Sequence, residues 1–195
     1  MRKIPFDSGK GYRLYLGENE LSEYLSCAKQ TPQRANLRDK ISISCLLAAR
    51  GGLRVSEISK ITNDMRFNTD ERGLCLRVPE TKSQYRETMI PPELQWADFN
   101  KYTHGTSRAT FSRWIKKVNE IYYEKTGDPD IHHLTYHDLR RNFIHRLVIL
   151  GLNIKYIQTL SGHKSDKVFY KHYVDIHSSE FGENQRKLVP WLNSD

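Results

Sequence analysis

The chain has few cysteines and no long apolar run. Cys27, Cys45 and Cys75 are odd in number, widely spaced, and lie in segments with the patterns of helix, helix and strand. They therefore indicate neither a disulfide framework nor a zinc cluster. No run approaches the ~18 apolar residues that a membrane-spanning helix needs, and the first residues lack the apolar stretch of a signal peptide. We expect a soluble protein in a reducing, intracellular setting.

Acidic residues are outnumbered by basic ones. Lys and Arg total 31 against 23 Asp and Glu, which gives a formal net charge of +8. This excess favours a polyanionic partner, because clustered Lys and Arg release condensed counterions from a phosphate backbone. A surface that is basic only for solubility would explain the charge equally well. The 195 residues fit one domain with a real hydrophobic core.

Helical spacing of apolar residues accounts for most of the chain. It predicts helices over residues 18–30, 37–49, from near Val55, and over 106–125, 138–150 and 154–160, the last closed by Gly162. Alternating apolar residues over 73–91 predict a β-hairpin with Lys82 near its turn. We expect a mainly α domain with a small antiparallel β-sheet, preceded by a strand-poor segment or linker remnant over residues 1–17.

Four short strings and one tyrosine suggest chemistry at a phosphate. The strings are GLRVSE at 52–57, TKS at 81–83, HDLR at 137–140 and SGHKS at 161–165, and Tyr173 follows His163 by ten residues. Displacing an oxygen from a phosphodiester builds negative charge on the phosphoryl oxygens, which fixed cations stabilise. Arg54 and Arg140 suit this role, because a guanidinium donates two parallel hydrogen bonds to phosphate and stays charged.

The remaining residues could move the protons. Lys82 could protonate the leaving oxygen as a general acid, and the Tyr173 hydroxyl could attack the phosphorus. His137 or His163 could accept the phenol proton or orient the phosphate. The resulting phosphotyrosine ester would conserve the energy of the broken bond, so we expect no ATP, metal or other cofactor.

Each of these residues also has a purely structural interpretation. Arg54 could pair with Glu57 at i,i+3, and His137 could belong to a helix cap with the following residue. Tyr173 lies in an aromatic stretch that could be core, and a lysine near a hairpin turn, such as Lys82, is usually solvated. As an ordered set, the coincidences are hard to produce by chance.

The strings GLRVSE, TKSQYRETMIP, HDLRRNF, LSGHKS and KHYVDI resemble the catalytic domain of tyrosine recombinases, or phage integrases, over residues 18–176. The resemblance implies two phosphate-binding arginines, a hairpin lysine, two active-site histidines, a nucleophile and an acidic residue that supports the first arginine. These are Arg54 and Arg140, Lys82, His137 and His163, Tyr173, and Glu57. Tyr170, seven residues after His163, is the alternative nucleophile.

The resemblance also implies a function. It predicts site-specific cleavage and rejoining of double-stranded DNA through a 3′-phosphotyrosyl intermediate, by a homo-tetramer on paired sites, to integrate or excise a viral or mobile element. Accessory directionality or DNA-bending proteins are possible partners, and a cytoplasmic or nucleoid location in a prokaryotic host is implied. The family usually carries an N-terminal domain that clamps the DNA, so we expect residues 18–176 alone to bind weakly.

Alternatives remain open at this stage. A type IB topoisomerase or telomere resolvase would share the chemistry, and a non-catalytic DNA-binding protein would share the charge. A metal-dependent nuclease could use His132, His133 and His137, but no cluster of carboxylates accompanies them. We expect His132 and His133 to lie in a loop before a helix. The apolar tail over residues 177–195 needs a surface to cover, and we expect it to contact a neighbouring subunit.

Overall fold

The computed structural model describes residues 2–5, 12–62, 65–69, 73–79, 85–91, 94, 105–163 and 169. Lys82, Tyr170, Tyr173 and the tail over 177–195 lie outside the described residues. The helices are α1 (Glu18–Ala28), α2 (Ala35–Gly51), α3 (Val55–Ile58), α5 (Arg108–Thr126), the 3-10 helix η2 (Pro129–His133), α6 (Tyr136–Ile149) and α7 (Ile154–Ser161). The strands are β1 (Arg2–Pro5), β2 (Tyr12–Tyr15), β3 (Arg66–Thr69), β4 (Gly73–Pro79) and β5 (Tyr85–Met89).

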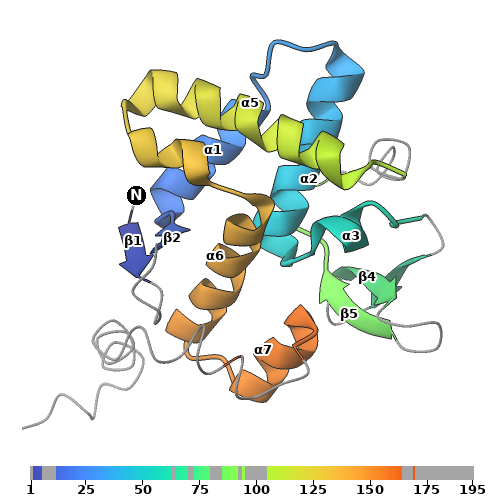
Figure 1. Cartoon of the computed structure of the whole chain (residues 1–195). Helices are drawn as coiled ribbons and strands as arrows, with labels where there is room; N and C mark the ends of the chain where they lie inside the picture. The colour runs from blue at the N-terminus through green and yellow to red at the C-terminus, as the bar shows by residue number, and fades with distance from the viewer. Residues whose placement is uncertain are drawn as a thin grey trace, which may run out of the picture.

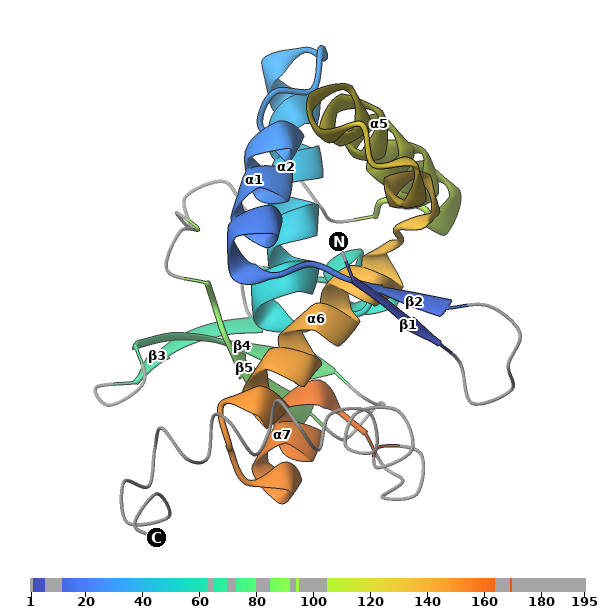
Figure 2. The same cartoon turned by 90° about the vertical axis from the view of Figure 1, so that its left-hand side faces the viewer.

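Two helices form the centre of the fold. α2 packs along α6, and α5 lies across the outer ends of α1 and α2 (Figure 1). The three-stranded antiparallel sheet, in the order β3-β4-β5, lies at the other end of α2, with α7 against β5. In Figure 2 the β1–β2 hairpin projects on the side of α6 away from α1. The ends of α2, α6 and α7 and the inner face of β5 therefore meet in one region.

Buried polar contacts fix where α6 begins. The hydroxyls of Tyr136, in its first turn, and Ser44 of α2 lie 2.6 Å apart. Tyr24 donates to Asn119 Oδ1 at 2.7 Å, and the Asn119 amide donates to the Leu134 carbonyl at 3.0 Å. Because unpaired buried polar groups are costly, these bonds select one position for the segment that leads into α6.

Most of the predicted elements are present. Each predicted helix is found with bounds that differ by at most two residues at either end, and the predicted hairpin is β4 paired with β5. Gly162 ends α7 in the left-handed conformation, with φ of 66°. All three cysteines are free and buried. Among the described residues, no helix is both long and apolar enough to cross a membrane.

The prediction of a strand-poor N-terminal segment was wrong. Residues 2–5 and 12–15 form an antiparallel hairpin, which contacts α6. Leu14 and Leu16 are buried, and the Leu16 amide donates to Asn142 Oδ1 at 2.8 Å. Leu14 and Leu16 have the two-residue period of a strand, but the run is short and its bonding partner is 126 positions away.

Two smaller expectations also changed. β3 adds a third strand to the predicted hairpin, pairing Arg66–Thr69 with β4. His132 and His133, expected in a loop, lie in the 3-10 helix η2, which begins at Pro129 after the Asp128 side chain caps the Asp130 amide.

Candidate active site

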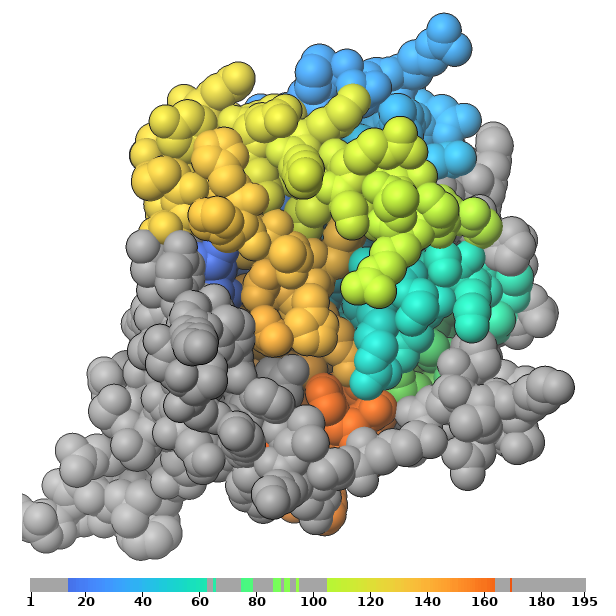
Figure 3. Space-filling view, in the orientation of Figure 1, coloured from blue at the N-terminus to red at the C-terminus, as the bar shows by residue number. Residues whose placement is uncertain are grey.

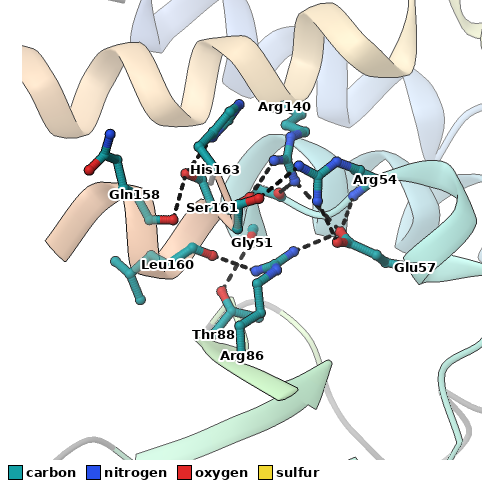
Figure 4. Close-up of polar contacts among 12 residues, drawn as sticks. Gly51, Arg54, Glu57, Arg86, Thr88, Arg140, Gln158, Leu160, Ser161 and His163 are labelled. Carbon is teal, nitrogen blue, oxygen red and sulfur yellow. Dashed lines mark hydrogen bonds and ion pairs between the residues drawn. The ribbon is translucent and has the colours of Figure 1, made fainter. Parts of the chain in front are cut away.

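Glu57 lies at the centre of a cluster of arginines (Figure 4). Its carboxylate accepts from the Arg54 amide at 2.6 Å, from Arg54 Nη1 at 2.9 Å and from Arg86 Nη2 at 2.7 Å. Arg140 Nη1 lies 3.6 Å from the same carboxylate. Three guanidinium groups from α3's start, β5 and α6 therefore converge on one acidic side chain that is 9% exposed.

Glu57 is ionised within this cluster. Burial alone would raise the pKa of its carboxyl, but Arg86, the Arg54 amide, Arg140 and the Arg54 side chain together lower the pKa below its ordinary value. Arginine keeps its charge throughout the accessible pH range. Three positive groups thus surround one negative group, and the cluster retains two positive charges.

The end of α7 supplies the other acceptors. Its last carbonyls bind one arginine each: Leu160 O accepts from Arg86, Ser161 O from Arg140, and Gly162 O from Arg54 at 3.1 Å. A helix C-terminus carries partial negative charge on carbonyls without intrahelical partners, so cations are favoured there. His163 follows these carbonyls directly, and its position depends on the three arginines.

Local structure explains how each arginine reaches the cluster. Arg54 is the N-cap residue of α3, and Glu57 accepts its amide in return, which ties the two residues together in the first turn. Gly52 has φ of 63°, and its carbonyl accepts from Arg140 Nη1. The left-handed turn at Gly52 therefore points its carbonyl toward α6 and allows α3 to begin next to α6.

A capping box sets the first turn of α6, which carries His137 and Arg140. Thr135 Oγ1 donates to Asp138 Oδ2 at 2.6 Å, the Thr135 amide donates to the same oxygen at 3.0 Å, and the Asp138 amide lies 3.3 Å from Thr135 Oγ1. The capping partner of Asp138 is thus Thr135, and His137 is not needed for the cap.

His163 is neutral near pH 7. Burial, with Arg140 and Arg54 as the next causes, lowers its pKa to about 4. Ser161 Oγ donates to the Ile157 carbonyl at 2.7 Å, because two oxygens so close require a hydrogen between them. His163 Nδ1, 2.8 Å from Ser161 Oγ, then carries the proton, which leaves Nε2 as a hydrogen-bond acceptor.

His137 shares this electrostatic setting. Burial, and secondly Arg141, lowers its pKa to about 4, although Asp138 acts in the opposite direction. Both histidines are therefore uncharged near neutral pH and supply no positive charge to the site there.

An open cleft of about 800 Å³ adjoins the cluster. It lies between the start of α3, the first half of α5, η2 and the start of α6, on the face drawn in Figure 3. Arg54, His137 and Arg140 line it together with the cationic Arg108 and Lys116 of α5. These side chains make the cleft positively charged, which favours an anionic ligand.

The structure brings together five of the seven residues singled out in the sequence. Arg54, Glu57, Arg140 and His163 are linked through the cluster, and His137 lies in the adjoining cleft. Lys82 and Tyr173 lie outside the described residues. Arg86, buried in β5, was missed. Its signal was an arginine in phase with the apolar Ile90, which places it on the inward face of the strand.

Solved structures share this fold. The Tn1549 transposon integrase, in complex with circular intermediate DNA, aligns over 90% of this chain and 64% of its own with a TM-score of 0.63 and 15% identity. The XerA recombinase aligns over 93% and 66% with a TM-score of 0.62 and 17% identity. The XerH site-specific recombinase bound to palindromic difH DNA, a post-cleavage complex, aligns over 96% and 56% with a TM-score of 0.67 and 11% identity.

The chain therefore has the fold of a tyrosine recombinase catalytic domain, and the expected class, mainly α with a small antiparallel sheet, is confirmed. No protein-family model matches the sequence, and no curated protein matches it either. The chain spans about two thirds or less of the length of these three recombinases.

Proposed function

We propose that the chain cleaves and rejoins double-stranded DNA as a tyrosine recombinase. The observation that carries the proposal is the arginine pair: Arg54 and Arg140 are held by Glu57 and by successive carbonyls at the end of α7, next to two neutral histidines. The similar Tn1549 integrase and XerH structures contain DNA, which supports a DNA substrate here.

The arginines would bind the scissile phosphate. The Arg54 side chain is 39% exposed and lines the cleft, whereas Arg140 is 1% exposed and is fixed by two backbone carbonyls. Donors fixed before the reaction stabilise the extra charge of the transition state without reorganisation, and each typically contributes about 10²–10³-fold. Arg54 supplies the accessible donor and Arg140 the rigid one.

The reaction balances without a cofactor. The Tyr173 oxygen bonds to phosphorus as the bond from phosphorus to the 5′ oxygen breaks, leaving a 3′-phosphotyrosyl ester. A histidine accepts the phenol proton, and Lys82 donates a proton to the departing 5′ oxygen. The 5′ hydroxyl of a second strand reverses these steps, so the energy of the first bond is kept and no nucleotide triphosphate is consumed.

The cleft offers the path for the flanking backbone. Arg108, Ser112 and Lys116 lie at successive turns of one face of α5, and His132 and His133 face the same cleft from η2. Cations and hydroxyls at helical spacing suit successive phosphates, whose contacts fix register without reading sequence. The net charge of +8 provides the corresponding long-range attraction.

More specifically, we propose that a tetramer recombines two specific duplexes and thereby integrates or excises a viral or mobile element. Relaxation of supercoiled plasmid would indicate a type IB topoisomerase instead, and closed hairpin ends would indicate a telomere resolvase. Directionality or DNA-bending proteins are the accessory partners expected with this function.

Covalent capture tests the proposal without a known target. The protein is incubated with a pool of DNA duplexes that have a randomised central segment, in EDTA and without nucleotide triphosphate. Protein-linked DNA is recovered after denaturation in SDS, amplified and selected again. Peptide mapping of the adduct should identify Tyr173, and Tyr173→Phe should abolish the adduct while DNA affinity is retained.

The controls separate the alternatives. Tyr170→Phe is the matched variant and should form adduct normally; adduct from Tyr173→Phe but not from Tyr170→Phe would reassign the nucleophile. DNA binding without any adduct would indicate a non-catalytic relative. Free cleaved ends that require magnesium or manganese would indicate a nuclease.

A further inference from the structure

Arg86 is a buried arginine with two directional contacts. Its side chain is 2% exposed, Nη2 donates to Glu57 Oε2 at 2.7 Å, and Nη1 donates to the Leu160 carbonyl. These partners lie 29 and 74 positions away in the sequence. The neighbouring Thr88 on the same inward face donates to the Gly51 carbonyl at 3.1 Å, so β5 is bonded to the ends of both α2 and α7.

The position of Arg86 excludes a direct role on the substrate. Unlike Arg54 and Arg140, it does not line the cleft. Its fork joins the carboxylate that holds Arg54 to the helix end that precedes His163. Lysine could reach one of these acceptors but lacks the planar fork that bonds both.

We propose that Arg86 is a positioning residue of the active site: it locks the Glu57 carboxylate to the C-terminal end of α7 and thereby fixes Arg54 and His163 relative to Arg140. This role deepens the proposed DNA cleavage and rests on it. Loss of the Arg86 fork removes one of the three arginine bridges between Glu57 and the end of α7, while Arg54 and Arg140 keep their contacts to Gly162 and Ser161. The expected result is a looser phosphate site in a folded protein.

The first test uses the protein without DNA. Arg86→Lys and Arg86→Met are compared with Arg77→Lys and Arg77→Met, because Arg77 is an exposed arginine on the adjacent strand β4, 3.7 Å from Glu87. Hydrogen exchange should be at least tenfold faster in both Arg86 variants for the His163 amide, which donates to Gln158 O, and unchanged in the Arg77 variants.

A histidine titration measures the effect of the Arg86 charge on His163. The groups that face His163 are Arg140 and His137 from α6, Arg54 from the start of α3, Arg86 from β5, and the Phe169 ring. The midpoint of the His163 ring signal in NMR should rise in Arg86→Met, which loses a positive charge, and less in Arg86→Lys. Unchanged exchange and an unchanged midpoint in both variants would overturn the proposal.

The second test uses DNA recovered by covalent capture. With DNA in saturating amounts, the cleavage rate should fall at least tenfold in Arg86→Lys, while DNA affinity stays within about threefold, since Arg86 does not line the cleft. Glu57→Gln completes a double-mutant cycle, and the two losses should be far from multiplicative because both residues act through one contact. Multiplicative losses, or a change in affinity alone, would refute the positioning role.

The two tests distinguish failure of the proposed cleavage from failure of the positioning role. If the parent protein forms no adduct with any duplex, the proposed cleavage is wrong, while exchange and the histidine titration still decide whether Arg86 fixes the end of α7. If the parent cleaves DNA and the Arg86 variants cleave at the parent rate, the positioning role is wrong and the proposed function stands.

Discussion

Gly52 is the backbone position on which the arginine cluster depends, and Gly52→Ala should be strongly destabilising. Gly52 has φ of 63°, and a Cβ added there would lie 2.4 Å from Cδ1 and 2.6 Å from Cε1 of Phe143. The left-handed conformation costs a residue with a side chain about 1–2 kcal/mol. Displacing a packed ring adds about 1–3 kcal/mol.

Gly127→Ala is the matched control. Gly127 also ends a helix with positive φ, at 68°, but no atom lies within 4 Å of its added Cβ. Both substitutions share the conformational cost and the loss of entropy in the unfolded chain, so these effects cancel in the comparison. The difference isolates the Phe143 contact, and we expect Gly52→Ala to be about 1–3 kcal/mol less stable than Gly127→Ala.

Urea unfolding followed by circular dichroism measures both free energies. Phe143→Leu should remove part of the difference when combined with Gly52→Ala, because the smaller side chain gives way to the new methyl group. Cleavage by Gly52→Ala should also fall at conditions where it is folded, since the Gly52 carbonyl holds Arg140. Equal stability of the two alanine variants would refute the clash.

Three further predictions concern the site and the tail. Arg54→Ala should lower the rate of DNA cleavage by roughly 10²-fold with the fold retained, as gel assays of adduct formation would show; cleavage at the parent rate would remove Arg54 from the site. The pKa of His163 falls from 6.5 to about 4 on folding, so the unfolded chain binds protons first and the free energy of unfolding should decrease as the pH falls through that window. His163→Gln should flatten this decrease in urea titrations at several pH values, and an unaltered slope would contradict the shifted pKa. Truncation after Ile176 should reduce assembly on paired DNA sites more than binding to one site, and equal assembly would show that the tail is no subunit connector.

Helices were predictable because their signal is local. The helix α5 repeats apolar residues at Phe111, Trp114, Ile115 and Val118, all of which are buried, and an N-cap serine and a closing glycine mark its ends. The β1–β2 hairpin offered no comparable signal. Its strands have four residues each, and the buried position of Leu16 depends on Asn142, which no local pattern connects to it.

The candidate site shows the same difference between local and long-range signals. Arg54 and Arg140 were recognisable from short strings whose residue types fit phosphate chemistry, and Glu57 from the resemblance to tyrosine recombinases. Arg86 belongs to the same cluster, yet in the sequence it is one polar residue of a strand with no chemical motif around it. What makes it part of the site is the meeting of β5 with α3 and α7, and its bonds span 29 and 74 positions.

The net charge of the cluster gives a physical reason why it contains three arginines and one carboxylate. Glu57 neutralises one of three guanidinium groups, and both nearby histidines are neutral, so about two positive charges remain. A phosphodiester carries one negative charge, and a second develops as the nucleophile bonds to phosphorus. In the proposed reaction, the cluster would have more charge than the ground state needs and would match the transition state, which is the condition for electrostatic catalysis. Glu57→Gln would raise this excess to three. It should tighten binding of uncleaved DNA and still slow cleavage, because the arginines lose the anion that holds their geometry. Faster cleavage by Glu57→Gln, measured on the recovered DNA, would mean that charge alone and not its placement limits the reaction.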